Sequence, residues 1–401
     1  MISKSKALSI IKNNTNQIDN EKVEVEKAID RVLTIDVKST ITSPPFDMSA
    51  MDGYAIKYNK ISNLLKPFQV LSEVFAGDSN DVKISNQEAI RIFTGGKVPA
   101  GANMIIIQEN VKILKNNKIL INQAFFGNTY IRKKGQDYKK GKVLLKKGKK
   151  INVRDIGLLL SSGINKVTVY RQPNVAVIAT GNELLNPKRK LKDNKIYASS
   201  LYMLKNLLQL SGAKCIGIKI IKDDEKLIKK YVKSLKNPDI IITTGGVSVG
   251  KKDLVKSTLN KLGMIQKFWK VSIKPGKPVL YGKIKNIHIF GLPGNPVSTY
   301  VCYFLFVLET ISRMKGQKNT YIKIKKAILL NDINNNSSRE SYYRGKYLIS
   351  NNQISVHTLN SQDSSLLHNL STANCLIKVP SNLKIIKKGK IIEIILLEMG
   401  F

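Results

Sequence analysis

The chain has 401 residues, more than one hydrophobic core usually accommodates, so two to four domains are expected. Hydrophobic residues make up 42% of it and charged residues 24%, a balance that excludes a largely disordered protein. The formal net charge is +39, but the lysines are spread along the whole sequence, whereas nucleic-acid-binding proteins cluster basic residues on one face.

The first 170 residues show helical spacing and then a β-rich texture. Apolar residues at helical spacing predict helices over 4–13 and 21–33. The N-terminal segment has no apolar core of the kind that a secretory signal needs. From about 66 to 150, short apolar runs alternate with Gly, Asn and Lys turns, which predicts a β-rich domain with a hairpin at Asn116-Asn117. A helix in "RDIGLLLSSG" then precedes a strand in "KVTVY".

Residues 173–316 alternate between fully apolar strands and helices. Strands are expected in "PNVAVIATG", "KCIGIKII", "PDIIITTGG" and "IHIFGL", with helices between them. This alternation is typical of an α/β fold in which a doubly wound, mostly parallel sheet carries helices on both faces. The apolar segment 297–311 is shorter than a membrane span and is expected to be a buried helix. From 320 onward, alternating strands predict a small β-barrel or sandwich.

The cysteines and histidines are scattered. Cys215, Cys302 and Cys375 lie in apolar runs without a CxxC pair, so they are expected to be reduced core residues of a cytoplasmic protein. The histidines, at 288, 357 and 368, are equally far apart. The sequence therefore indicates neither a zinc cluster nor a Ser/His/Asp triad.

Ligands of an open parallel sheet bind beyond the carboxyl ends of its strands, where this chain has glycine-rich loops. These are "ATGNEL" (179–184), "TTGGVSVGKKD" (243–253) and "GLPGNPVS" (291–298). Glycines let backbone N–H groups approach an anion, and a following helix adds its dipole. "KPGKP" at 274–278 supplies Lys274 and Lys277 near the same edge. The alternative for each loop alone is a tight or solvated turn.

Carboxylates follow several of these strands. Glu183, Asp223 or Asp224, and Asp253 could meet a phosphate-binding backbone, an arrangement that suits Mg²⁺ bridging to a substrate phosphate, although each could instead cap a helix. The stretch "PPFDMSAMDGYA" at 44–55 holds Asp52 on a loop fixed by prolines. Gly53 is expected there for a backbone conformation closed to other residues. The alternative for this stretch is a self-capped turn.

The motifs, in this order, resemble those of the molybdopterin molybdenumtransferase family, which includes the bacterial MoeA proteins and the E domain of gephyrin. They are "FDMSAMDGYA", "FTGGKVPAGAN", "IRKKGQDYKKG", "ATGNEL", "TTGGVSVGKKD", "KPGKPV" and "GLPGNPVS". The resemblance runs from about residue 5 to the C-terminal strands. Because seven motifs stand in register over 250 residues, coincidence is implausible.

The resemblance implies four domains and a homodimer. An elongated N-terminal domain would comprise 1–45 with 140–170, an inserted β-rich domain 46–139, a MogA-like, doubly wound molybdopterin-binding domain 171–317, and a C-terminal β-barrel 318–401. The active site would lie between one subunit's doubly wound domain and the partner's inserted region, so that Asp52 works across the interface. The upstream adenylyltransferase and molybdoenzyme chaperones are further candidate partners, while no specific nucleic acid and no membrane are expected.

The resemblance also implies the reaction, which is Mg²⁺-dependent insertion of molybdate, as substrate, into adenylylated molybdopterin with release of AMP. The catalytic residues implied are Asp52, Asp137, Glu183, Asp224 and Asp253, with Asp52, Glu183 and Asp253 as metal ligands. The substrate-binding residues implied are Ser49, Thr180, Gly181, Gly245, Gly246, Ser248, Gly250, Lys274, Pro275, Lys277, Pro293, Asn295, Pro296 and Ser298. No protein thiol is needed, because the sulfurs belong to the substrate.

The sequence departs from the family pattern at a few positions, which keep alternatives open. "IYASS" has Ala198 where the family usually carries Asp, Lys251 replaces an acidic residue, "TGNEL" has Asn182, and "QDSSLL" replaces "QGSG". One alternative is a catalytically weakened relative that binds molybdopterin or acts as a scaffold. The other is a molybdopterin adenylyltransferase, although such enzymes normally lack the flanking regions. The lysine enrichment is interpreted as compositional drift, with a functional polyanion surface as its alternative.

Overall fold

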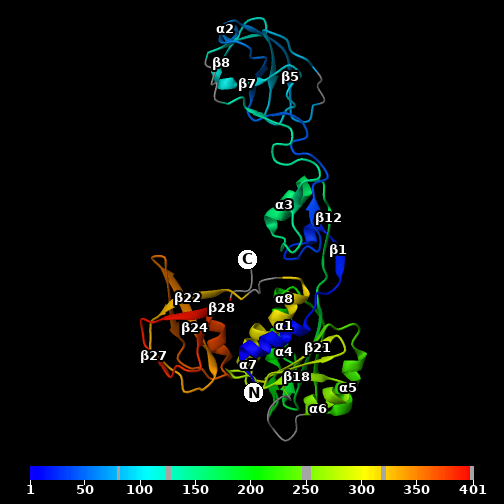
Figure 1. Ribbon diagram of the computed structural model, residues 1–401, viewed down its shortest axis with the longest axis vertical. Helices are drawn as coiled ribbons and strands as arrows, with labels where there is room; N and C mark the ends of the chain where they lie inside the picture. Colours follow the sequence, from blue (N-terminus) through cyan, green and yellow to red (C-terminus); the bar gives the residue numbers. More distant parts are fainter. Residues whose placement is uncertain (79–81, 123–127, 246–253, 318–321, 398–401) are drawn as a thin grey trace. The chain divides into compact units, whose positions relative to one another are not determined.

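The computed structural model describes residues 1–78, 82–122, 128–245, 254–317 and 322–397 (Figure 1). The chain divides into two compact units. The larger unit comprises 1–21, 30–34 and 168–401, and the smaller unit comprises 22–29 and 35–167. The four-domain division implied by the resemblance is finer than these units and stays a prediction.

A six-stranded sheet forms the centre of the larger unit, in the order β16-β13-β17-β21-β20-β18. Its strands are β13 (Asn174–Thr180), β16 (Lys214–Ile221), β17 (Ile240–Thr244), β18 (Ile265–Trp269), β20 (Leu280–Ile284) and β21 (Ile287–Leu292). The first four strands in that order run parallel, as predicted, whereas β20 and β18 add an antiparallel edge that the sequence did not indicate. The predicted doubly wound sheet is therefore confirmed.

Helices cover both faces of this sheet because its strands are apolar on both sides. They are α1 (Lys4–Asn14), α4 (Ser199–Leu210), α5 (Glu225–Ser234), α6 (Leu254–Lys261), α7 (Pro296–Cys302) and α8 (Leu308–Met314), with a π-helical turn over Tyr303–Val307 between the last two. Val177 packs in the core with α1, α4, α7 and α8, and its neighbour Ile178 packs with α5 and α6 (Figure 1). The alternation of strand side chains thus builds a hydrophobic core on each face.

The N-terminal helix is confirmed, but the predicted helix over 21–33 is wrong. The structure has strand β1 (Asn20–Glu24) and a short 3-10 turn (Val25–Lys27) instead. Asp30 then adopts a φ of 62°, which no right-handed helix tolerates. The apolar residues Val25, Ala28, Val32 and Leu33 are still buried, so tertiary packing uses them without a helix.

The C-terminal strands of the larger unit close into a five-stranded barrel. Its strands are β22 (Ile324–Leu329), β24 (Glu340–Ser350), β25 (Gln353–Thr358), β26 (Cys375–Val379) and β28 (Ile391–Leu396), and β26 pairs with both β28 and β24. The short strand β19 (Ile273–Lys274) pairs in parallel with the start of β24. That pairing attaches the KPGKP loop to the barrel. Smaller elements here are β14 (Leu184–Leu185), β15 (Ile196–Tyr197), β23 (Ile333–Asn334), α9 (Leu367–Thr372) and β27 (Ile385–Ile386).

The smaller unit is built on a sheet in the order β7-β4-β6-β5-β9-β8. Its strands are β4 (Gly53–Ile56), β5 (Phe68–Val74), β6 (Glu88–Ile92), β7 (Met104–Ile107), β8 (Val111–Leu114) and β9 (Lys118–Ile121). The predicted hairpin is confirmed: β8 pairs with β9, and Asn116 and Asn117 take φ of 59° and 52°. Other elements are β2 (Val37–Lys38), β3 (Met48–Ser49), α2 (Ile61–Leu64), β10 (Ile131–Arg132), β11 (Val143–Leu145), α3 (Val153–Ser161) and β12 (Lys166–Tyr170), whose last residues enter the larger unit.

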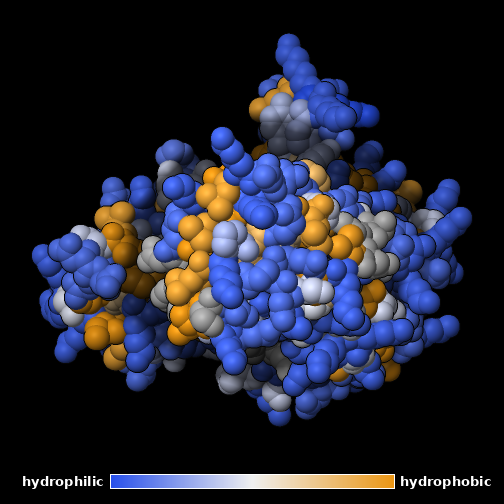
Figure 2. Space-filling model, turned by 90° about the horizontal axis from the view of Figure 1, so that it is seen from above, coloured by the Kyte–Doolittle hydropathy of each residue, from blue (hydrophilic) through white to orange (hydrophobic). Residues whose placement is uncertain are grey.

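Surface hydropathy and the apolar helix agree with the expectation of buried cores. On the face shown in Figure 2, most residues are hydrophilic and the hydrophobic ones form smaller groups between them. The segment 297–311 forms α7, the π turn and most of α8, and nearly all of it is buried. Among the described residues, no helix has the length and apolar character that crossing a membrane requires.

Candidate active site

The described residues of the loops predicted to bind a ligand meet at one edge of the larger sheet. The parallel strands β13, β17 and β21 end at Thr180, Thr244 and Leu292, so the loops that follow them emerge side by side. A Cβ added at Gly294 would lie 3.7 Å from the Cα of Gly245, which shows how closely two of these loops approach. Two clefts open there, and both are lined by Gly245, Gly294 and Asn295.

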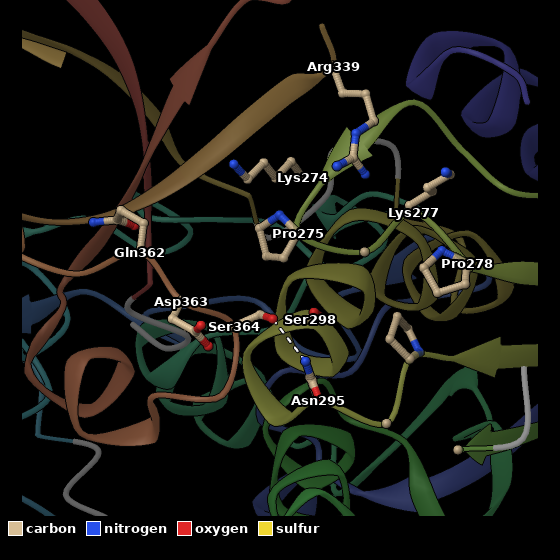
Figure 3. Close-up of a pocket in the computed structure, with 14 residues that line it drawn as sticks. Lys274, Pro275, Lys277, Pro278, Asn295, Ser298, Arg339, Gln362, Asp363 and Ser364 are labelled. Carbon is tan, nitrogen blue, oxygen red and sulfur yellow. Dashed lines mark hydrogen bonds between the residues drawn. The ribbon is translucent and has the colours of Figure 1, made fainter. Parts of the chain in front are cut away.

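The first cleft, of about 780 Å³, is rich in cations. Lys274 and Lys277 come from the predicted KPGKP loop, and Arg339 comes from the residue before β24 (Figure 3). The guanidinium of Arg339 donates from Nη1 to the carbonyl oxygen of Ile273 at 2.9 Å, which holds it beside that loop. Asp363 is the only acidic side chain among the described lining residues. The cleft therefore favours an anion.

Gly245 is required by its surroundings. Its φ is +81°, and an added Cβ would lie 2.4 Å from the carbonyl oxygen of Thr180. A side chain at this position would be strained and would also collide with the backbone of β13. The glycine thus allows the start of the loop after β17 to lie against the end of β13, which is the physical reason for its place in the predicted loop.

Polar side chains from the loop after β21 line the floor of the first cleft. Ser298 in α7 is 5% exposed, and its hydroxyl has no hydrogen-bond partner among the described residues. Asn295 donates from Nδ2 to the Oγ of Ser364 at 2.9 Å, as Figure 3 shows. The carbonyl oxygen of Pro293 accepts a hydrogen bond from the Thr299 hydroxyl at 2.6 Å. These contacts fix the loop and leave the Ser298 hydroxyl available to a ligand.

The turn 361–365 of the barrel lines both clefts and is anchored by a buried arginine. Arg344, which is 1% exposed, donates from Nη2 to the carbonyl oxygens of Ser361 at 3.3 Å and Asp363 at 2.9 Å. The amide of Gln362 bonds in turn to the backbone N–H and carbonyl of Arg344 at 2.8 and 3.0 Å. The Asp363 carboxylate accepts from the hydroxyl and N–H of Ser365, which hold its pKa below the usual range. The turn is therefore preorganised.

Replacing Arg344 by Met should destabilise this region. Two part-buried carbonyl oxygens would lose their hydrogen bonds to the guanidinium, so the free energy of unfolding should fall by about 2–4 kcal/mol. Urea denaturation would measure the change, with the exposed Arg189→Met as the matched control, expected to lie within about 0.5 kcal/mol of the unsubstituted protein. Equal stability of the Arg344 and Arg189 variants would contradict the anchoring role.

The second cleft, of about 370 Å³, has hydroxyls and a helix terminus in place of cations. Its lining includes Thr180, Thr244, Glu183 and the start of α4 at Ser199 and Ser200. Glu183 is exposed and is the only carboxylate among the described lining residues. Ala198 stands at the N-cap of α4 and offers no side-chain hydrogen bond. This cleft therefore presents mainly neutral hydrogen-bond donors.

The Asp52 loop lies in the smaller unit and is rigid. Asp52 accepts through Oδ1 from the backbone N–H of Thr94 at 2.7 Å and from its hydroxyl at 2.8 Å. These bonds lower the pKa of Asp52, and the bond from the backbone N–H has the largest effect. Oδ2 has no hydrogen-bond partner among the described residues and remains open to a ligand. Asp47 is fixed similarly by Lys133 and Lys134.

The predicted reason for Gly53 is wrong. Gly53 does not adopt a positive φ in the structure. Instead, an added Cβ would lie 2.0 Å from the carbonyl oxygen of Ile106 on the neighbouring strand. Close approach of β4 to β7, and not a special backbone conformation, excludes a side chain here. Ser49 of the same motif is fully buried and donates its hydroxyl to the carbonyl of Met51, so it shapes the turn.

The remaining predicted residues fall into three groups. Pro275 lines the first cleft and Pro296 the second. Three others line neither cleft. Asp224 caps α5 by accepting from the N–H of Leu227 at 2.9 Å, and Gly181 donates its N–H to the carbonyl oxygen of Ile221. Asp137 is exposed and lies in the smaller unit. Gly246, Ser248, Gly250 and Asp253 lie outside the described residues, as does Lys251. The structure thus brings the lysines, Ser298, Asn295, Thr180, Gly245 and Glu183 together.

The fit of Mg²⁺ to the described donors is partial. Within the described ranges, no group of three His, Cys, Asp or Glu side chains is arranged to hold a metal ion. Mg²⁺ commonly binds through one or two carboxylates together with substrate phosphates, and it keeps several waters. Glu183 in the second cleft is compatible with such a site, in which the substrate would supply further oxygens.

Arg339 and Arg344 were missed by the sequence analysis, as was the role of Gln362. All three lie in or after "SSRESYYRG", where the alternation of apolar residues indicated only strands. An arginine in a strand that is 1% exposed is unusual, because a buried charge needs hydrogen-bond partners. Burial could not be read from the sequence, so nothing there distinguished these arginines from the many exposed basic residues.

Comparison with protein families covers nearly the whole chain. Residues 2–163 match the MoeA N-terminal region (domain I and II), residues 176–313 match a probable molybdopterin binding domain, and residues 326–397 match the MoeA C-terminal region (domain IV). Every described lining residue of the two clefts lies within the second or the third of these regions.

Individual relatives and a solved structure also resemble this chain over nearly its whole length. A molybdopterin molybdenumtransferase of Haemophilus influenzae is 34% identical over 386 residues, 93% of each chain. One of Staphylococcus aureus is 32% identical over 402 residues, which are 98% of this chain and 94% of that one. The crystal structure of a molybdopterin biosynthesis MoeA protein from Pyrococcus horikoshii superposes with a TM-score of 0.80 at 30% identity, covering 99% of this chain and 100% of the other.

Proposed function

The chain belongs to the molybdopterin molybdenumtransferase family, and from this premise we propose that it inserts molybdate into adenylylated molybdopterin with release of AMP. Family membership makes it a transferase of molybdenum cofactor biosynthesis that acts on molybdopterin and molybdate. The adenylylated substrate, the release of AMP and the use of Mg²⁺ are the proposed part.

The observation that carries the proposal is the cationic cleft beside one that is lined mainly by hydroxyls. Lys274, Lys277 and Arg339 offer positive charge to an oxyanion such as molybdate, and the buried Ser298 hydroxyl offers a further donor. Fixed donors aimed at an anion stabilise charge more effectively than water does, because they need no reorganisation. We place molybdate in the first cleft and the phosphates of the pterin substrate toward the second.

The proposed reaction does not depend on a nucleophilic side chain of the protein. Cleavage of the substrate's phosphoanhydride bond by water releases AMP, while the two dithiolene sulfurs replace oxygen on molybdenum. The displaced oxygen leaves as water with the thiol protons. Burial raises the pKa of the Cys302 and Cys375 thiols, and no step uses them. The residues of this chain bind and orient the anions, and Mg²⁺ when bound would neutralise phosphate charge, with Glu183 and Asp52 as its proposed ligands.

Assembly and location complete the proposal. A homodimer would allow Asp52 to act on substrate held in the clefts of the other subunit, as the resemblance implies. Three free cysteines suit a reducing compartment, so we propose that the protein works in the cytoplasm. A molybdopterin adenylyltransferase is disfavoured because the MoeA N- and C-terminal regions match on both sides of the molybdopterin-binding domain.

Lys274→Met should weaken molybdate use specifically. Loss of one cation from the first cleft is expected to raise the KM for molybdate by about 10–100-fold, since a charge-assisted hydrogen bond is worth about 1.5–3 kcal/mol. Steady-state AMP release at varied molybdate would measure this, with and without Mg²⁺. Lys236→Met removes an exposed lysine that lines neither cleft and serves as the control. An unchanged KM for Lys274→Met would place molybdate elsewhere.

A further inference from the structure

Three polar side chains of the larger unit, Lys4, Glu340 and Tyr342, form a hydrogen-bonded cluster that lines neither cleft. The Nζ of Lys4 donates to the hydroxyl of Tyr342 at 2.8 Å and lies 2.7 Å from Oε1 of Glu340. The Tyr342 hydroxyl in turn donates to the same oxygen of Glu340. Each of the three polar groups is therefore held by both of the others.

The cluster is mostly shielded from water. Tyr342 is 1% exposed, and the side chains of Lys4 and Glu340 are 21% and 24% exposed. Burial acts to raise the pKa of Glu340, but the hydrogen bonds from Lys4 and Tyr342 outweigh burial, so this pKa lies below its usual value. The carboxylate is thus charged, and charge-assisted hydrogen bonds are stronger in such surroundings than on an open surface.

The cluster joins two elements that both hold the chain leading into the KPGKP loop. Lys4 begins α1, and just before it Ile2 accepts through its carbonyl oxygen from the N–H of Ser272 at 2.8 Å. Glu340 begins β24 and stands opposite Ile273 in the parallel pairing of β24 with β19. The segment 270–274 is therefore bonded both to the N-terminal residues and to β24, and the cluster ties these two supports to each other.

Two cations of the first cleft are direct neighbours of this pairing. Lys274 follows Ile273 in β19, Arg339 precedes Glu340, and both line the first cleft (Figure 3). A shift of β24 relative to β19 would therefore move Lys274 and Arg339 with respect to each other. Binding of an oxyanion by fixed charges depends on where those charges stand before the ligand arrives, so such a shift would weaken it.

We propose that the cluster of Lys4, Glu340 and Tyr342 is a positioning device for the first cleft, which fixes β24 against β19 and thereby sets the spacing of Lys274 and Arg339. The three residues act through these two cations and do not contact the ligand themselves. That the ligand is molybdate rests on the proposed function, whereas the positioning of the cations does not.

The test compares Lys4→Met and Glu340→Gln with the unsubstituted protein by hydrogen–deuterium exchange and by equilibrium dialysis with molybdate. Loss of the cluster should speed amide exchange in 270–279 at least about tenfold and leave exchange in β16 unchanged, because only the segment next to the cluster is released. The dissociation constant for molybdate should rise about tenfold, as expected for displaced cations.

Lys387→Met is the matched control. Lys387 forms an ion pair of 2.9 Å with Asp332 in the same C-terminal region and lines neither cleft. Its replacement should change neither the exchange of 270–279 nor the affinity for molybdate.

Combination with Arg339→Met separates positioning from general stability. Glu340→Gln should weaken molybdate binding by a smaller factor in the Arg339→Met background than in the unsubstituted protein, because one of the cations that the cluster positions is then missing. Lys4→Met combined with Glu340→Gln should be no weaker than either change alone, since each already breaks the same ion pair.

The inference is overturned if 270–279 exchanges no faster in Lys4→Met and Glu340→Gln than in the unsubstituted protein, or if the effects of Glu340→Gln and Arg339→Met are additive. If the unsubstituted protein binds no molybdate, the proposed place of molybdate is wrong, and the exchange measurement by itself decides whether the cluster positions the cleft.

Discussion

Asp52→Asn should lower molybdenum transfer by about 10²–10³-fold without unfolding the protein. Asn keeps an oxygen at Oδ1 that can accept from the Thr94 N–H and hydroxyl, so the loop should hold its shape. What the substitution removes is the negative charge and the open Oδ2 acceptor. AMP release and melting temperature, measured on the same preparation, separate these effects.

Thr94→Val is the matched control for the loop. It removes the hydroxyl that bonds to Asp52 at 2.8 Å but leaves the carboxylate charged, so it should reduce the rate far less than Asp52→Asn does. If Asp52→Asn were as active as the unsubstituted protein while Asp52→Ala lost stability, the carboxylate would have only a structural role in its own loop.

The proposed action of Asp52 across a dimer has a direct consequence for mixed subunits. A heterodimer of Asp52→Asn with Lys274→Met, isolated by two different tags, would contain one site with both residues intact. At a molybdate concentration well below the KM of Lys274→Met, where each variant alone has little activity, it should recover about half of the activity of the unsubstituted dimer. An inactive heterodimer would show that Asp52 and Lys274 must belong to the same subunit.

Gly245→Ala should weaken substrate binding in both clefts. The positive φ costs about 1 kcal/mol for a residue with a Cβ, and the 2.4 Å contact with the Thr180 carbonyl forces the loops apart. We expect the affinity for AMP and the rate of molybdenum transfer each to fall at least about tenfold.

Gly263→Ala separates the effect of backbone dihedral strain from the effect of steric crowding by the added Cβ. Gly263 has a similar φ of +88° in the same unit, but an added Cβ would meet no atom within 4 Å. It should lose about as much stability from the dihedral angle and keep full activity. Equal activity of the two alanine variants would mean that the approach of the two loops does not matter for function.

The larger sheet could be predicted because its central parallel strands are buried on both faces. Ile240, Ile241 and Ile242 are all fully buried, which makes the strand a continuous apolar run in the sequence. The edge strand β18 lacked that signal, because Ile265 and Gln266 are exposed and resemble loop residues in the sequence. The false helix at 21–33 shows the converse, where buried positions happened to follow helical spacing.

The candidate site could be predicted where local chemistry requires particular residues. Gly245, Lys274, Lys277 and Ser298 belong to short motifs, and the structure places all of them around one cleft. Arg339 could not be found, because only the pairing of β19 with β24 brings it to that cleft. Asp224 illustrates the limit: a carboxylate after a strand can line a site or cap a helix, and in the structure it caps α5.

The most direct test of the account is to measure AMP released and molybdenum bound in one reaction of the purified protein with adenylylated molybdopterin, molybdate and Mg²⁺. The proposed reaction requires that AMP appears only when molybdate is present, in an amount equal to the molybdenum incorporated. Tight binding of the substrate with neither AMP release nor molybdenum incorporation would contradict it, and would identify the chain as a molybdopterin-binding protein on an enzyme's fold.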